Sequence, residues 1–219
     1  MAIDPVLLAA AVPAQTGETV LDAGLGSGAA SLCLLARVPG CAACGIELQP
    51  ALAELARCNT VLNGMALEVV EGDLLDQPAA LRGRQFAHVI TNPPYAEAGG
   101  GPVSPDPQRG RAHAGADTAA WIDACLKRLE PGGRLTVIHR ADRLGTLLAA
   151  IEGRAGDVAV LPLWPRAGEA ARRVILGARK GSRAPLRLLP GLVLHEADGR
   201  FTPAADAVLR DGAPLALSA

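Results

Sequence analysis

Short apolar runs of strand length alternate with segments of helical periodicity along most of this chain. Such alternation is typical of a mostly parallel sheet whose two faces are covered by helices, because each crossover helix packs back onto the sheet. The strand candidates are Thr19–Ala23, Ala43–Glu47, Leu67–Glu71, Ala87–Thr91, Arg134–His139, Val158–Leu163 and Arg173–Ala178. The helix candidates are Gly28–Arg37, Pro50–Asn63, Thr118–Leu129 and Arg143–Glu152. The pattern predicts an α/β fold with a doubly wound, mostly parallel, seven-stranded sheet.

Composition favours a single domain over residues 1–219, with residues 180–219 as its C-terminal extension. The chain has 219 residues, which is long enough to bury a core without disulfides or a metal. Half of the residues are apolar, but few are aromatic. The aromatic residues are Phe86, Tyr95, Trp121, Trp164 and Phe201. The core must therefore consist mainly of Ala, Leu and Val, and an aromatic side chain beside a functional motif is unusually informative.

The cysteines and the N-terminal segment predict a reducing, cytoplasmic setting. The 5 cysteines are scattered among apolar residues, without the regular spacing of a disulfide framework. Cys41 and Cys44 form a C-x-x-C pair, but no second pair follows at zinc-ligand spacing, so we expect buried thiols and no metal. The apolar N-terminal run contains Asp4 and no basic residue before Arg37, unlike a secretory signal. No uncharged run reaches the length of a membrane span.

Basic residues concentrate in the second half of the chain, although the formal net charge is only -1. Arg172 and Arg173 belong to an arginine-rich stretch in that half. Such a stretch can neutralise nucleic-acid phosphates, and it is equally typical of a solvated surface. We therefore predict Arg172 and Arg173 as RNA-binding candidates, with an ordinary charged surface as the open alternative.

A glycine-rich segment directly follows the first predicted strand and precedes a helix. Gly24, Gly26 and Gly28 let the backbone turn tightly beside a ligand, and the helix start presents free N–H groups. The spacing Gly24-x-Gly26-x-x-Ala29 also satisfies the weak dinucleotide-binding pattern. Asp22 favours S-adenosylmethionine instead, because a carboxylate there accepts hydrogen bonds from an ammonium group and repels a pyrophosphate. We predict that Asp22 and the three glycines contact this cofactor.

Carboxylates also stand at the ends of the next two predicted strands. Glu47 is placed to accept hydrogen bonds from the ribose hydroxyls of an adenosine. Asp73 is placed to accept from the adenine amino group, and the adjacent Leu48 and Leu74 complete the predicted cofactor contacts. One such acid alone is typical of a solvated surface. Acids at three successive strand ends, at the edge where these folds bind ligands, favour a site.

The fourth predicted strand ends in Asn92-Pro93-Pro94-Tyr95. Proline cannot continue a central strand, so the chain leaves the sheet there and presents Asn92 at the ligand edge. An aromatic amine must become pyramidal as its nitrogen attacks a methyl group, and acceptors for its two hydrogens assist that change. The Asn92 amide oxygen and the Pro93 carbonyl oxygen are such acceptors. Tyr95 can stack on the flat acceptor, beside Pro94.

A stretch from residue 96 to residue 117 interrupts the alternation of strands and helices. It is rich in glycine, proline and charged residues and has no apolar periodicity. A loop this long in a compact domain is usually functional or disordered. Because it follows the Asn-Pro-Pro-Tyr motif directly, we predict a flexible loop on the substrate side, with an inert insertion as the alternative.

These motifs resemble the class I S-adenosylmethionine-dependent methyltransferases that carry an Asn-Pro-Pro-Tyr signature, among them adenine N6, guanine N2 and protein glutamine N5 enzymes. Within this superfamily, the chain is similar to the bacterial tRNA1(Val) adenine N6-methyltransferase group over nearly its whole length. The supporting segments are Ile3–Ala10, Ile138–Asp142, Leu192–Glu196 and Phe201-Thr202. Members of this group usually carry a further N-terminal segment, whereas Met1 here stands three residues before Asp4. Two explanations are open: the sequence starts late, or a piece that helps to cap the cofactor is missing, in which case we expect less than full activity.

The resemblance implies a Rossmann-like fold, S-adenosylmethionine as cofactor and tRNA adenine N6 as acceptor. It implies cofactor contacts at Asp22, Gly24, Glu47 and Asp73, and acceptor contacts at Asn92 and Tyr95. Protein glutamine N5 and rRNA guanine N2 methylation remain alternatives because they use the same motif. Two readings of another class are a non-catalytic cofactor-binding module that docks on RNA and an NAD-dependent oxidoreductase, which leaves the Asn-Pro-Pro-Tyr motif unexplained.

Overall fold

The computed structural model describes residues 3–76, 78–94 and 118–217, and it contains every strand and helix that the sequence predicts. The long strands are β1 (Thr19–Ala23), β2 (Ala42–Glu47), β3 (Leu67–Glu71), β4 (Phe86–Thr91), β5 (Leu129–Arg140), β6 (Ala155–Trp164) and β7 (Arg173–Lys180). Two short strands, β8 (Arg187–Leu188) and β9 (Leu192–Val193), were not predicted and pair with β6. The helices are α1 (Asp4–Ala11), α2 (Ala29–Arg37), α3 (Pro50–Leu62), α5 (Thr118–Arg128), α6 (Leu144–Ile151) and α7 (Pro203–Asp211).

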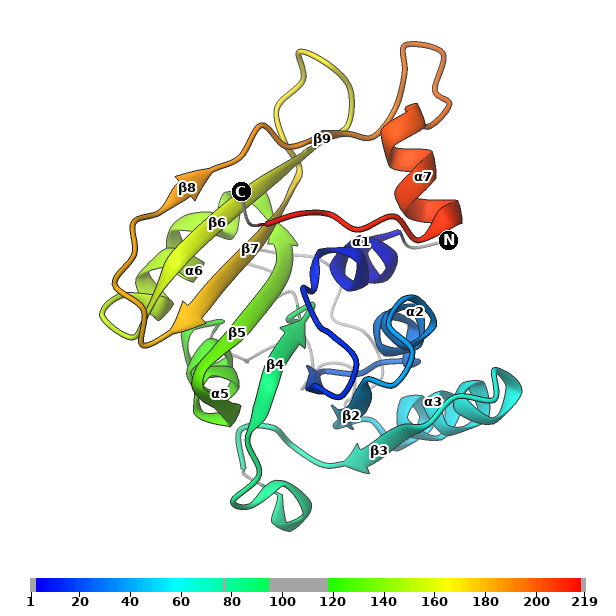
Figure 1. Cartoon of the computed structure of the whole chain (residues 1–219), viewed down its shortest axis with the longest axis vertical. Helices are drawn as coiled ribbons and strands as arrows, with labels where there is room; N and C mark the ends of the chain where they lie inside the picture. Colours follow the sequence, from blue (N-terminus) through cyan, green and yellow to red (C-terminus); the bar gives the residue numbers. More distant parts are fainter. Residues whose placement is uncertain (1–2, 77, 95–117, 218–219) are drawn as a thin grey trace, which may run out of the picture.

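The strands form one sheet in the order β3-β2-β1-β4-β5-β7-β6-β8, with β9 also paired to β6. Figure 1 shows the sheet extending from β3 and β2 through β4, β5 and β7 to β6 and β8. Strands β1 to β5 run parallel to one another, whereas β7 runs antiparallel to both β5 and β6. The predicted mostly parallel α/β fold is confirmed. The carboxyl ends of β1, β2, β3 and β4 meet at one edge, which we call the carboxyl edge, and their first residues lie at the opposite amino edge.

Two apolar cores cover the two faces of the sheet. Alternate residues of a strand point to opposite faces, so in β4 Ile90 joins one core and Val89 the other. The core around Ile90 contains residues of α1, α2 and α7, and the core around Val89 contains residues of α5 and α6. Ala56 of α3 packs on the α1 side, against Ala43 and Leu67 of the sheet. Both cores are built mainly from Ala, Leu, Val and Ile, as the composition predicts.

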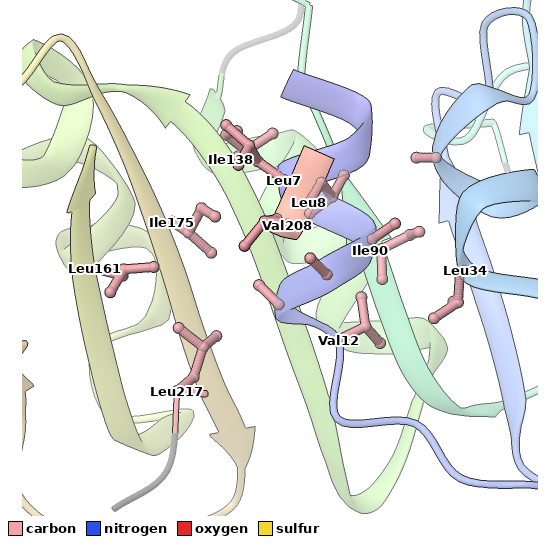
Figure 2. Packing of buried hydrophobic residues seen from close by; sticks show 14 of the residues in the cluster. Leu7, Leu8, Val12, Leu34, Ile90, Ile138, Leu161, Ile175, Val208 and Leu217 are labelled. Atoms are coloured by element: carbon pink, nitrogen blue, oxygen red, sulfur yellow. The ribbon is translucent and has the colours of Figure 1, made fainter. Parts of the chain in front are cut away.

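Helix α1 lies in the middle of the first core, where Leu7 and Leu8 are fully buried (Figure 2). They belong to one cluster with Ile90 of β4, Leu34 of α2 and Val208 of α7. The periodicity of the sequence does not predict α1, because its segment is almost entirely apolar. A helix buried on every side lacks the amphipathic periodicity by which a surface helix is recognised.

Two arginines tie the ends of α1 to the rest of the domain. Arg37 of α2 donates through Nη2 to the carbonyl oxygens of Ala9 and Val12, at 2.9 and 2.5 Å. These carbonyls lie at the C-terminal end of α1, where the helix leaves acceptors without internal partners. At the other end, Arg173 Nε donates to Asp4 Oδ2 at 3.1 Å. The N-terminal helix is therefore an integral part of the fold.

Helix α7 closes the same face and has clear end signals that the sequence analysis did not use. Thr202 caps its start by accepting a hydrogen bond from Ala205 N at 3.1 Å, and Pro203 occupies the first turn. Gly212, at φ 68°, ends the helix in the left-handed conformation. Among the described residues, the helices are all too short or too polar to span a membrane.

Candidate functional site

The carboxyl edge collects polar residues from four adjacent strands. Asp22 pairs with Ile90 in the β1–β4 register, and Glu47 pairs with Glu71 in the β2–β3 register. Asn92 therefore leaves the sheet directly beside the loop that follows β1. The sequence predicted that these strand ends share one edge, and the strand order places them side by side.

The glycine-rich loop after β1 has a backbone that requires glycine. Gly24, Gly26 and Gly28 have φ angles of 80°, 56° and 83°, in the left-handed region that other residues rarely adopt. The N–H groups of Gly24 and Leu25 both donate to the carbonyl oxygen of Ile46, at 3.0 and 2.9 Å. The loop is thereby fixed against the end of β2 before it turns into α2.

Glu47 is almost fully buried, with 6% of its surface exposed. Its Oε2 accepts from Gly26 N at 2.7 Å, and its Oε1 accepts from Gln49 N at 2.9 Å. Each carboxylate oxygen can accept a further bond. The carboxylate is thus held by the backbone of two loops and keeps acceptor capacity for a ligand hydroxyl. This role of Gln49 was not predicted, because any residue except proline could donate through its backbone N–H.

Asp22 is the most deeply buried acid of the edge, with 2% of its surface exposed. It accepts a hydrogen bond from Ser31 Oγ of α2 at 2.8 Å. Burial raises the pKa of Asp22 to about 7, against the lowering effect of the Ser31 bonds, and the nearby Glu47 adds to the rise. A cationic group beside this carboxyl would favour its charged form. The site therefore fits a ligand that carries an ammonium group.

The remaining predicted cofactor contacts, Asp73, Leu74 and Leu48, differ in how deeply they are buried. Asp73 is half-buried, and its Oδ1 accepts from Leu75 N at 2.8 Å. Leu74 is buried in the second core, whereas Leu48, after β2, is 46% exposed. Leu74 also lines a cavity of about 400 Å³ between this segment and α5. Leu74 is thus the predicted cofactor contact that borders this cavity.

The Asn-Pro-Pro motif begins directly after a fully buried residue, Thr91. Asn92 and Pro94 are half-buried and Pro93 is buried. Tyr95 and the predicted loop over residues 96–117 lie outside the described residues, so both stay predictions. The structure thus brings Asn92 and Pro93 to the carboxyl edge, next to the glycine-rich loop.

Trp121 of α5 also reaches this edge, and the sequence analysis did not assign it to the site. Its Nε1 donates to Thr91 Oγ1 at 2.9 Å, and its ring lies against Gly24. The signal was present, since aromatic residues are scarce in this chain and two of them flank the 96–117 stretch. Position in the sequence alone could not show that α5 packs next to the glycine-rich loop.

Of the two predicted RNA-contacting arginines, Arg172 directly precedes β7 and Arg173 is its first residue, which pairs with Arg140 at the end of β5. Arg172 is exposed. Arg173 is half-buried and bonded to Asp4, so it serves the anchoring of α1. The structure therefore places both arginines near the carboxyl edge but gives them different environments, and RNA binding by either stays a prediction.

The cysteine pair is buried, as predicted. Cys41 and Cys44 have 7% and 2% of their surfaces exposed, and both are free thiols. Burial raises the pKa of Cys44 to about 12, which makes it a poor nucleophile and a poor metal ligand at neutral pH. In the part of the chain that the structure describes, no three acidic, cysteine or histidine side chains cluster as metal ligands would.

A second cavity, of about 470 Å³, lies at the amino edge. We call it the amino-edge cavity, and its lining includes Glu18, His88, Arg134 and Arg179. His88 Nε2 and Glu18 Oε2 are 2.8 Å apart, and Arg134 pairs with Asp157 at 3.3 Å. The charged side chains around this cavity are thus largely engaged with one another or with the backbone.

The fold and the carboxyl edge together define the class of this protein. A parallel sheet with a single inserted antiparallel strand, a glycine-rich loop after β1 and Asn-Pro-Pro after β4 are the features of S-adenosylmethionine-dependent methyltransferases of class I. The family model that describes the methyltransferase small domain matches residues 4–152. The chain belongs to this family.

Three similarities to individual proteins agree with this membership. The chain is 28% identical over 217 residues to a tRNA1(Val) (adenine(37)-N6)-methyltransferase from Dickeya chrysanthemi, covering 95% of this chain and 85% of the relative. A shorter match, 42% identical over 76 residues, covers 35% of the chain and 26% of a release factor glutamine methyltransferase from Deinococcus radiodurans. A crystal structure described as a predicted O-methyltransferase from Agrobacterium tumefaciens superposes with a TM-score of 0.81 at 29% identity, covering 97% of this chain and 98% of that one.

Proposed function

We propose that this methyltransferase transfers the methyl group of S-adenosylmethionine to the exocyclic N6 amine of an adenine in tRNA. The observation that carries the proposal is the position of Asn92. Its strand, β4, pairs with β1 so that Thr91 lies opposite Ala23, the last residue before the glycine-rich loop. An acceptor held by Asn92 is therefore next to a ligand held by that loop.

The proposed cofactor contacts follow the four strand ends. The buried Asp22 carboxyl accepts from the ammonium of the methionine part, and the loop of Gly24, Gly26 and Gly28 lies under that part. Glu47, held by backbone N–H groups, accepts from the ribose hydroxyls. Asp73 accepts from the adenine amino group, and the side chains of Leu48 and Leu74 flank the ring. S-adenosylmethionine supplies the electrophilic methyl group.

The proposed acceptor contacts explain why a carboxamide and a proline follow β4. The Asn92 amide oxygen and the Pro93 carbonyl oxygen accept the two amine hydrogens, which directs the nitrogen lone pair at the methyl carbon. Positioned acceptors of this kind assist the change of shape at nitrogen without reorganising during the reaction. The nitrogen forms a bond to carbon as the carbon–sulfur bond breaks, and one amine proton then leaves to water.

The choice of acceptor rests on two further observations. Similarity to the tRNA adenine N6 enzyme spans nearly the whole chain, whereas similarity to the glutamine enzyme covers about a third of it. Asn92 and Pro93 also suit an amine with two hydrogens better than a hydroxyl, which favours N-methylation over the O-methylation that the Agrobacterium protein's description names. The exposed Arg172 suits an RNA phosphate. A tRNA acceptor also agrees with the predicted cytoplasmic location.

The direct test is methyl transfer from labelled cofactor to separate pools of tRNA, rRNA and protein, followed by nucleoside analysis of the labelled product. We expect label in tRNA, recovered as N6-methyladenosine. Guanine N2 methylation in rRNA, labelled glutamine in protein or labelled hydroxyl groups would each replace this proposal with another acceptor. The matched control is the Asn92→Ala chain, which should bind S-adenosylhomocysteine and transfer no label.

A further inference from the structure

Trp121 connects the two halves of the proposed site. We propose that Trp121 is a positioning residue, which fixes the distance between the Asn92 motif and the glycine-rich loop through the hydroxyl of Thr91. The inference rests on the proposed function, since it assigns Asn92 and the loop to the two reacting partners. None of the catalytic contacts proposed above includes Trp121 or Thr91.

A directional chain of hydrogen bonds carries this inference. An indole N–H can only donate, so Thr91 Oγ1 accepts from Trp121 Nε1 at 2.9 Å. The single hydroxyl hydrogen of Thr91 then goes to the carbonyl oxygen of Ala23, at 2.7 Å. Thr91 directly precedes Asn92, and Ala23 directly precedes Gly24. The chain of bonds therefore joins the backbone positions from which the acceptor motif and the cofactor loop begin.

The indole ring also contacts the cofactor loop directly. A Cβ atom built on Gly24 would lie 3.1 Å from Trp121 Cζ2 and 3.6 Å from its Cη2. Because Gly24 has a positive φ of 80° and this neighbour, the loop has little freedom to move toward α5. The indole ring thus limits movement of the glycine-rich loop toward α5.

Helix α5 provides a firm base for this contact. Ile122, Cys125 and Leu126 follow Trp121 on the helix and have at most 1% of their surfaces exposed. They belong to the second core, against which Trp121 also packs. A rigidly packed helix holds a side chain in place more accurately than a loop does, so the position of Trp121 is set by the core.

The expected kinetic effect follows from this geometry. A small misplacement of the reacting groups strongly lowers the rate of methyl transfer. Binding of the cofactor depends on other contacts, which the hydrogen bonds from Trp121 to Thr91 and from Thr91 to Ala23 do not make; we call these two bonds the relay. Trp121→Phe removes the N–H together with part of the ring, including the Cζ2 and Cη2 atoms that face Gly24, whereas variants of Thr91 leave the indole whole. We expect Trp121→Phe to lower kcat about tenfold, with the KM for S-adenosylmethionine changed by less than about threefold.

Thr91 variants separate positioning from general packing. Thr91→Val preserves shape but removes both bonds, and it should lower kcat at least as much as Trp121→Phe. Thr91→Ser restores the hydroxyl and should recover most of the rate. Trp164→Phe is the matched control. Trp164 ends β6, and its Nε1 donates to Pro190 O, away from β1 and β4, so this variant should leave kcat unchanged. Equal losses in Thr91→Ser and Thr91→Val, or a rise in KM without a fall in kcat, would overturn the proposal.

A spectroscopic test needs no RNA and therefore distinguishes failure of this inference from failure of the proposed function. The chain has 2 tryptophans, so its nitrogen-15 spectrum contains two indole N–H signals, and Trp164→Phe assigns them. We expect Thr91→Val, but not Thr91→Ser, to shift the Trp121 signal strongly. We also expect S-adenosylhomocysteine to shift the Trp121 signal and leave that of Trp164 in place. A Trp121 signal that responds to neither change contradicts the relay, even if the wild-type chain methylates tRNA.

Discussion

The two edges of the parallel sheet both contain polar side chains, but they hold them differently. At the amino edge, the side chains contact each other, as in the contact between the half-buried Glu18 and the buried His88. At the carboxyl edge, Glu47 is held by backbone N–H groups of two loops and Asp22 by one hydroxyl. The amino-edge cavity is the larger of the two described above. Cavity size is therefore a poorer guide to the ligand edge than the way in which buried acids are held.

Asn92→Ala is the strongest way to test the assignment of chemistry to the carboxyl edge. The variant removes an acceptor that the proposal requires only during transfer, so kcat should fall by about 100-fold or more. The affinity for S-adenosylhomocysteine, measured by calorimetry, should stay within a few-fold of wild type. A large loss of cofactor affinity instead would place Asn92 in the cofactor pocket.

Asp22→Asn tests the buried acid. Its pKa rises from 3.8 in the unfolded chain to about 7 in the folded protein. The folded state therefore binds more protons between these values, and stability falls as pH rises through this window. We expect the variant to be more stable than wild type at pH 8, by roughly 1 to 3 kcal/mol, and no more stable near pH 4. Urea unfolding at both pH values measures this.

The same substitution should weaken cofactor binding at pH 8. A neutral amide attracts the ammonium group much less strongly than a carboxylate does, so we expect affinity to fall by roughly tenfold or more, the equivalent of one lost charged hydrogen bond. In the wild-type protein, affinity should increase from pH 6 to pH 8 as Asp22 loses its proton. An affinity that is flat over this range and unchanged in Asp22→Asn would remove Asp22 from the proposed contacts.

Arg172, which precedes β7, and Arg173, which starts it, sharpen the comparison within the carboxyl edge. Arg172→Ala should weaken tRNA binding several-fold and reduce the slope of log affinity against log salt by about 1. Arg173→Ala should in addition lower the melting temperature, because it releases Asp4 at the start of α1. Filter binding at three salt concentrations, with thermal unfolding alongside, separates the two roles. An unchanged salt slope in Arg172→Ala would make it ordinary surface.

Glu18→Gln is expected to give the smallest effect and tests the amino edge. Burial opposes ionisation of Glu18, but hydrogen bonds from His88 and the Gln15 backbone bring its pKa below 4.5. The bond to His88 therefore contributes stability above that value and loses it as pH falls further. We expect the variant to lose less than about 1 kcal/mol at pH 7 and to methylate tRNA at the wild-type rate. A clear loss of activity would break the distinction between the two edges.

The parts of the fold that follow a local rule could be predicted from the sequence. Strands β1 and β3 have the predicted bounds. The glycine-rich loop and Asn-Pro-Pro follow directly after β1 and β4, as the sequence predicts. Helix α1 could not be found by periodicity, because burial on all sides removes the polar stripe. The two-residue strands β8 and β9 depend on pairing with β6, which no short segment of sequence specifies.

The site shows the same division between local and tertiary information. Asp22, Glu47 and Asn92 were predictable because strand ends of a parallel sheet share an edge. The contact between Trp121 and Thr91 was not, since it depends on how α5 docks after an intervening stretch of about twenty residues with no secondary-structure signal. The holding of Glu47 by Gly26 and Gln49 uses only backbone donors. The types of residues 26 and 49 therefore do not predict that they hold Glu47.

The burial of α1 also has a consequence for how the chain matures during synthesis. Its Ala10 carbonyl accepts from Leu215 N at 2.8 Å, and its apolar residues share a cluster with Val208 and Leu217. During synthesis α1 therefore leaves the ribosome well before residues 208–217 and stays exposed until they arrive, and such long-range closure is slow. In that interval the apolar helix is available to chaperones, and it becomes buried only when residues 208–217 have emerged and packed on it.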